Sequence, residues 1–60
     1  MTQAKRAILI RILYDPDFSI EKVLTNKDEE INQRLFVLEY MDKVQKWIER
    51  VRIYRLKSHA

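Results

Sequence analysis

The sequence has no cysteine and no glycine, and its 60 residues include one proline and one histidine. Without cysteine there is no disulfide and no thiolate metal site. The histidine, His59, stands next to last, where chain ends fray, so we do not expect it to be a metal ligand. Sheet proteins use glycine in tight hairpin turns and helices do not need it, so the missing glycine favours helices.

A catalytic set of residues is also missing. Nucleophilic catalysis needs a base within hydrogen-bond reach of the nucleophile, and His59 is the only histidine. A chain without glycine has no phosphate-cradling loop of the Walker or dinucleotide type. Asp28, Glu29 and Glu30 are consecutive, and consecutive helical side chains point about 100 degrees apart, so they cannot all face one ion. We therefore expect a protein that is not an enzyme and binds no cofactor or metal.

Long apolar runs are absent as well. No stretch approaches the roughly 18 uncharged apolar residues of a membrane span. The apolar run at 7–10 is interrupted by Arg11 and no small-residue cleavage site follows, so a signal peptide is not expected. We expect a cytoplasmic protein with no membrane partner.

The composition that is present is amphipathic, with 47% hydrophobic and 35% charged residues, as in folded chains. Residues 1–60 suffice for a single small domain. Such a domain buries only about 60% of the surface of its unfolded chain, and small folds usually add a disulfide, a metal or a partner subunit. With the first two excluded, we expect self-association as a homodimer.

Two turn signals divide the chain into three expected helices. The proline within 15–17 disfavours helical geometry in the residue before it and ends the first helix. Asn26 as N-cap places Glu29 at the third helical position, and Thr25 does the same for Asp28; either spacing makes a capping box. The expected helices cover about residues 3–14, 18–25 and 27–56.

The segment 27–56 is strongly amphipathic. At about 100 degrees per residue its apolar residues gather on one face. These are Phe36, Val37, Tyr40, Met41, Val44, Trp47, Ile48, Val51 and Tyr54. A second stripe of Ile31, Leu35 and Leu38 follows i, i+4, i+7 spacing on the opposite side. One surface helix explains only one stripe, so we expect these three residues to form a partner-binding surface.

The fold class predicted from these elements is all-α, with two or three helices and one long amphipathic C-terminal helix, assembling as a dimeric bundle. An alternative stays open because residues 8–14 and 50–55 alternate apolar and other side chains, as strands do. Two terminal strands pairing beside a central helix would give an α+β domain.

Positive charge gathers in the second half of the chain. Residues 1–30 carry five basic and six acidic side chains, whereas residues 31–60 carry seven and three. From residue 50 onward there are four basic residues and no acid, with a tyrosine among them that could stack on a base. On a helix the four cations scatter, which weakens a nucleic-acid site. The candidate residues are Arg50, Arg52, Tyr54, Arg55 and Lys57.

Two functional hypotheses follow. The first is a small non-enzymatic interaction or regulatory protein, an adaptor or inhibitor, which docks on another protein through Ile31, Leu35 and Leu38. The second is a nucleic-acid-binding protein that uses the basic C-terminal segment. A helix-turn-helix is disfavoured because the acids at 28–30 would face the phosphates.

Overall fold

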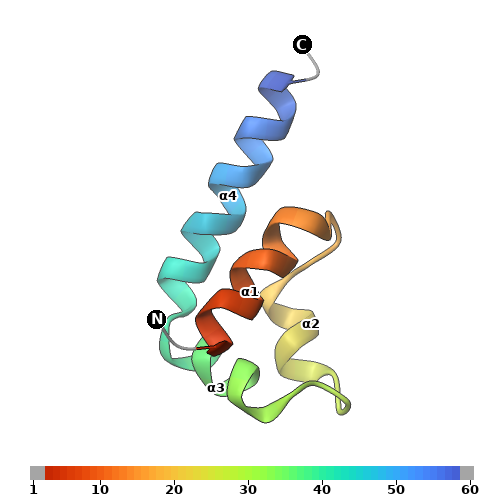
Figure 1. Ribbon diagram of the computed structural model, residues 1–60, viewed down its shortest axis with the longest axis vertical. Coiled ribbons are helices and arrows are strands. Elements are labelled where there is room, and N and C mark those ends of the chain that lie inside the picture. Colours follow the sequence, from red (N-terminus) through yellow and green to blue (C-terminus); the bar gives the residue numbers. More distant parts are fainter. Residues whose placement is uncertain (1–2, 59–60) are drawn as a thin grey trace.

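The computed structural model describes residues 3–58, which form four helices and no strand (Figure 1). The helices are α1 (Gln3–Tyr14), α2 (Ile20–Thr25), α3 (Ile31–Glu39) and α4 (Met41–Ser58). The all-α prediction and its long C-terminal helix are confirmed, with four helices in place of two or three. His59 lies outside the described residues.

The alternative with terminal strands is wrong for the described residues, since the two alternating segments lie in α1 and α4. The physical reason is visible in α1. Ile8 and Ile12, four residues apart, are both buried, whereas Ile10 between them is exposed. The spacing that decides burial is therefore that of a helix, and the alternation of isoleucines is incidental.

The turn between α1 and α2 forms as the sequence predicts. The Asp15 carboxylate accepts a hydrogen bond from the amide two residues on (3.0 Å), and the Asp15 carbonyl accepts one from the amide of Phe18 (3.1 Å). The turn delivers the Phe18 ring into the core. Ser19 then caps α2, because its hydroxyl oxygen accepts a hydrogen bond from the amide of Lys22 (3.2 Å).

The expected start of the third helix is wrong. Asn26 ends α2 instead of capping the next helix, and its side-chain oxygen accepts a hydrogen bond from the amide of Asp28 (3.0 Å). The N-cap of α3 is Glu30, whose carboxylate accepts hydrogen bonds from the amides of Asn32 and Gln33 (3.0 and 3.1 Å). An acid satisfies the free amides of a helix start as well as an amide or hydroxyl side chain does, so the chain had several possible caps.

The expected single helix over 27–56 is also wrong, because it breaks at Tyr40 into α3 and α4. Tyr40 has φ −118° and ψ 37°, outside the helical range. The break lets α3 pack against α1 and α2 while α4 continues alongside α1 (Figure 1). A single straight helix could not make both sets of contacts, those of α3 with α1 and α2 and those of α4 with α1.

All four helices contribute to one small core. Its buried side chains are Ile8, Ile12, Phe18, Val23, Val37, Val44 and Ile48. Burying one such aliphatic side chain stabilises the fold by about 1.5–3 kcal/mol. The described residues also leave a larger set of big apolar side chains exposed. That set is Ile10, Leu13, Tyr14, Ile31, Leu35, Leu38, Tyr40, Met41, Ile53, Tyr54 and Leu56.

Candidate functional site

The structure brings together the three residues predicted to bind a partner. Ile31, Leu35 and Leu38, here called the α3 stripe, are 64%, 55% and 50% exposed. Val37, on the opposite side of the same helix, is 0% exposed. The helix therefore has one apolar side in the core and a second apolar side with no covering element among residues 3–58.

Polar contacts along its flanks fix the orientation of α3. The Arg34 guanidinium donates to the carbonyl oxygens of Val23 (3.4 Å) and Asn26 at the end of α2. On the other flank the Arg11 guanidinium of α1 donates to the Gln33 side-chain oxygen (3.1 Å). Because both neighbouring helices hold α3 in this way, rotating the α3 stripe inward would break these hydrogen bonds.

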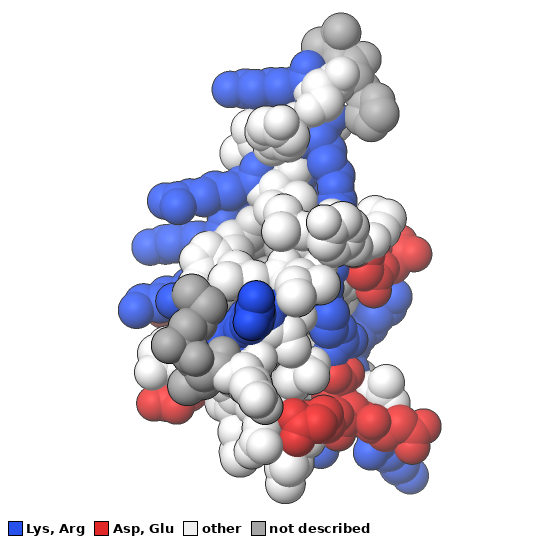
Figure 2. Space-filling model, in the orientation of Figure 1, with Lys and Arg blue, Asp and Glu red and all other residues white. Residues whose placement is uncertain are grey.

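Acidic side chains surround the α3 stripe. Residues 26–39 carry two basic and four acidic side chains, a formal charge of −2. Figure 2 shows acidic side chains gathered where the loop before α3 lies in Figure 1. Arg34 is one of the two basic residues, and its guanidinium is engaged by backbone carbonyls. Glu29 is likewise paired with Arg11, and Glu30 caps α3, which leaves Asp28 and Glu39 as the acids not engaged in this way.

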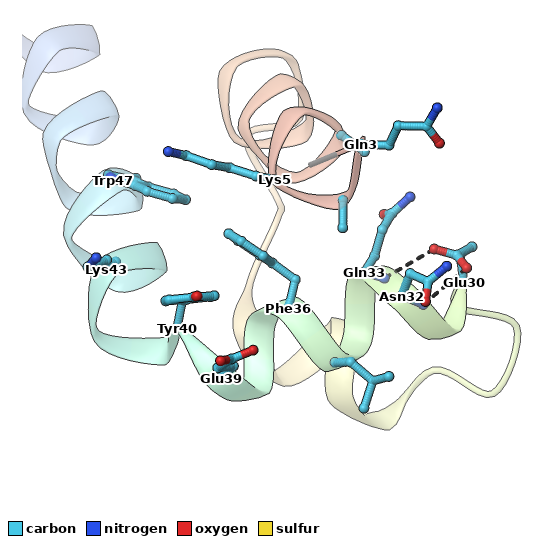
Figure 3. A pocket seen from close by; sticks show the side chains of 13 residues that line it. Gln3, Lys5, Glu30, Asn32, Gln33, Phe36, Glu39, Tyr40, Lys43 and Trp47 are labelled. Atoms are coloured by element: carbon cyan, nitrogen blue, oxygen red, sulfur yellow. Dashed lines mark hydrogen bonds between the residues drawn. The ribbon is translucent and has the colours of Figure 1, made fainter. Parts of the chain in front are cut away.

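A groove of about 1040 Å³ adjoins the stripe, between the first turns of α1, α3 and the first turns of α4 (Figure 3). Phe36 lies at its centre, with ring centroids 4.9 Å from Tyr40 and 6.2 Å from Trp47. Leu35 belongs to the α3 stripe and also lines this groove. The α3 stripe and the groove therefore adjoin at Leu35.

Two lysines lie over the aromatic rings of the groove. Lys5 Nζ is 5.8 Å from the ring centroid of Trp47, and Lys43 Nζ is 5.5 Å from that of Tyr40. These are cation–π distances, which hold the ammonium groups at the rim (Figure 3). The sequence reading placed Phe36, Tyr40 and Trp47 in the main apolar face and missed that they line an open groove.

The groove combines aromatic side chains with amide, carboxylate and lysine side chains. Among residues 3–58, its lining includes no serine, threonine, cysteine or histidine. Of its two carboxylates, Glu30 and Glu39, the first caps α3, and the side-chain oxygen of Gln33 accepts a hydrogen bond from Arg11. Among residues 3–58, no three carboxylate, thiol or imidazole side chains come together as a metal would require.

The five candidate nucleic-acid residues separate into two groups on α4. Arg55 lies against α1, where its guanidinium donates to the carbonyl oxygens of Ile12 (3.3 Å) and Leu13 at the helix C-terminus. Arg52 lines the same crevice between α1 and α4. The other three are exposed at i, i+4, i+7 spacing on another side of the helix, and they are Arg50, Tyr54 and Lys57.

The sequence reading missed two further cations, Lys43 and Lys46, which extend that group toward the N-terminus of α4. The five residues Lys43, Lys46, Arg50, Tyr54 and Lys57, here called the α4 stripe, are spaced by three, four, four and three residues. That spacing keeps them on one side of a helix, a pattern that counting from residue 50 alone could not reveal. Figure 2 shows basic side chains projecting along one edge of α4.

No helix within residues 3–58 combines the length and the apolar character needed to cross a bilayer. Comparison with protein-family models, curated proteins and solved structures found no match to this chain. The chemistry of the two stripes and the groove is therefore the guide to the protein's function.

Proposed function

We propose that this protein acts by docking on another protein through the α3 stripe, as an adaptor, inhibitor or regulator. The observation that carries the proposal is the two-sided apolar character of α3. Its inner side is fully buried, and Ile31, Leu35 and Leu38 on its outer side are each at least half exposed. Contiguous exposed apolar patches with a polar rim mark sites at which proteins bind partners.

The area that a stable interface needs indicates that the α3 stripe and the groove together form the docking surface. Covering the exposed half of each stripe residue would contribute about 1 kcal/mol per side chain. A stable interface buries about 800 Å² on each partner, roughly one sixth of the 4963 Å² surface of this chain. Three side chains are too few for that area. The groove adds Phe36, Tyr40 and Trp47, and aromatic residues dominate binding energy at interfaces.

The expected partner presents an amphipathic helix whose apolar side lies along the stripe. This helix-in-groove mode uses anchors at i, i+4 and i+7, the spacing of the stripe itself. The acids around α3 favour a partner with lysine or arginine beside its apolar anchors, because complementary charge speeds association and excludes wrong partners.

A second copy of this chain is a less suitable occupant of the stripe. In a two-fold pair the same patch meets itself, so the acids of 26–39 on both copies would share one interface. Like charges at an interface disfavour such pairing. The homodimer expected from the small core stays a prediction, as does the cytoplasmic location.

The test compares wild-type protein with Leu35→Asp and Leu13→Asp. Leu13 is a matched control, because it is a leucine of the same 55% exposure on α1. Each tagged protein is used to capture partners from lysate of its own host after nuclease treatment, and its mass is measured by sedimentation.

We expect Leu35→Asp to lose a stoichiometric partner that both wild type and Leu13→Asp retain, with helical circular dichroism unchanged. A dimer that only Leu35→Asp dissociates would identify the occupant as a second copy. If neither association depends on Leu35, the α3 stripe is not the docking surface.

A further inference from the structure

The α4 stripe has a geometry that protein docking at α3 does not explain. At about 100 degrees per residue, Lys43, Lys46, Arg50, Tyr54 and Lys57 fall within an arc of about 80 degrees. All five are exposed. They extend over 14 residue steps, roughly 21 Å along the helix axis.

The charge on this helix is concentrated and uncompensated. α4 carries six basic and two acidic side chains, a formal charge of +4 within a chain of net charge +3. Both acids, Asp42 and Glu49, fall outside the arc of the stripe. Within residues 3–58, none of the four stripe cations lies within ion-pair distance of a carboxylate.

Two arginines of α4 lie on another side of the helix, toward α1. Arg55 binds the carbonyl end of α1, and Arg52 lies beside it at the crevice. With these two removed from the candidate set, the remaining cations no longer scatter around the helix. They form one row that flanks Tyr54, whose side chain is 73% exposed.

We infer that the α4 stripe binds single-stranded nucleic acid. Its four cations contact consecutive phosphates, and the Tyr54 ring stacks on one unpaired base between Arg50 and Lys57. Cations that follow a backbone beside aromatic rings on which bases stack are the two elements of sequence-tolerant single-strand binding. Lys43 lies three residues before Lys46 and Arg50 four residues after it, so these phosphate contacts share one side of the helix.

Two observations favour a single strand over other polyanions. A duplex keeps its bases paired and stacked, so the Tyr54 ring would have nothing to stack on. A membrane surface needs a helix with one continuous apolar side. The exposed apolar residues at the end of α4, Ile53 and Leu56, instead lie away from Tyr54, with Lys57 between Ile53 and Tyr54 around the helix.

The experiment measures fluorescence anisotropy of a labelled single-stranded oligonucleotide of about 15 nucleotides as the full chain is added. Four phosphate contacts predict a slope of about −2.8 for log affinity against log salt. A fourfold rise in salt should then weaken binding roughly 50-fold. Trp47, the only tryptophan, borders the stripe and gives an independent fluorescence signal.

The central variant is Lys46→Glu with Arg50→Glu, and its matched control is Lys22→Glu with Lys27→Glu. Both doubles lower the net charge by four units, and all four positions are exposed. We expect the stripe double to lose at least about 10-fold in affinity and to halve the salt slope to about −1.4. The control double should stay within about threefold of wild type. Equal losses in both doubles would overturn the inference, since net charge alone would then explain binding.

The stacking contact is tested by Tyr54→Ala and Tyr54→Phe. We expect about a 10-fold loss for Tyr54→Ala and less than about a twofold change for Tyr54→Phe, which keeps the ring. Equal losses would mean that the hydroxyl acts and the ring does not, which contradicts stacking.

A duplex of the same sequence and vesicles containing anionic lipid complete the design. We expect both to bind at least about fivefold more weakly than the single strand. A duplex bound equally well, vesicles bound in preference to the oligonucleotide, or no binding of the single strand at low salt would each overturn the inference. Loss of the protein partner at α3 would leave all these readouts unchanged, so the two proposals fail separately.

Discussion

α3 and α4 are consecutive helices separated by one residue, yet their outer sides differ in kind. Each gives one side to the core, through Val37 in α3 and through Val44 and Ile48 in α4. Away from the core, α3 presents the aliphatic α3 stripe and α4 presents the cationic α4 stripe. An outer side made of aliphatic residues gains by being covered with protein, whereas one made of lysine and arginine gains by contact with phosphates.

The surrounding charge separates the two helices further. Residues 26–39 have a formal charge of −2, and α4 has a formal charge of +4. The two proposals therefore assign partners of opposite charge to the two helices.

The largest effect we expect comes from comparing two isoleucines on α4. Ile48 is 6% exposed and Ile53 is 53% exposed. Ile48→Ala should lower the free energy of unfolding by about 2–5 kcal/mol, because it removes buried methyl groups and leaves a cavity. Ile53→Ala should change it by less than about 0.5 kcal/mol. Urea unfolding followed by circular dichroism measures both, and equal effects would contradict the assigned inner side of α4.

The next largest effect tests the division of the α4 arginines. Arg55→Ala should lower the free energy of unfolding by about 1–2 kcal/mol, since it leaves two carbonyl oxygens at the end of α1 without their charged donor. Arg52→Ala, at a position with no hydrogen bond to α1, should change it by less than about 0.5 kcal/mol. The same urea titration serves here. A larger loss of unfolding free energy for Arg52→Ala than for Arg55→Ala would contradict the assignment of the stabilising contact to Arg55.

A smaller effect tests where α3 begins. Glu30→Ala removes the carboxylate that accepts from the amides of Asn32 and Gln33, and should lower the free energy of unfolding by about 1 kcal/mol. Thr25→Ala, at the cap position that the sequence suggested, should lower it by less than about half that amount. A larger loss of unfolding free energy for Thr25→Ala than for Glu30→Ala would mean that the helix begins near residue 27, as the sequence predicted.

Leu38→Asp should have the smallest effect on stability and yet remove binding of the protein partner. Leu38→Asp should leave the midpoint of thermal unfolding within about 3 °C of wild type, because half of this side chain already faces water. It should nonetheless remove binding of the protein partner, as Leu35→Asp should. Unfolding of Leu38→Asp at room temperature would show that the residue belongs to the core.

The sequence predicted those helix ends at which a single residue, such as proline, restricts the backbone conformation. The proline at position 16 predicts the end of the first helix, and α1 ends at Tyr14, directly before Asp15. The break at Tyr40 carried no such signal, because neither glycine nor proline stands near it. It arises from tertiary packing, in which α3 has to contact α1 and α2 together.

The two surfaces were unequally predicted. The spacing of the α3 stripe is local, so the sequence identified its three residues before their exposure was known. The spacing of the α4 stripe is equally local, but charge counted from residue 50 onward left out Lys43 and Lys46 and included Arg55, which the structure places at the end of α1. A cation that binds another helix, as Arg55 does, has to be set apart before the exposed cations of a helix show their common side.

The central claim is that the outer side of α3 meets protein. The most direct measurement places a photoreactive diazirine side chain at position 38 or position 54 and irradiates the tagged protein in lysate of its own host. We predict that position 38 yields a protein adduct that survives nuclease, and that position 54 yields an adduct that nuclease removes. A nuclease-resistant protein adduct from position 54 with none from position 38 would contradict the assignment of the two helices.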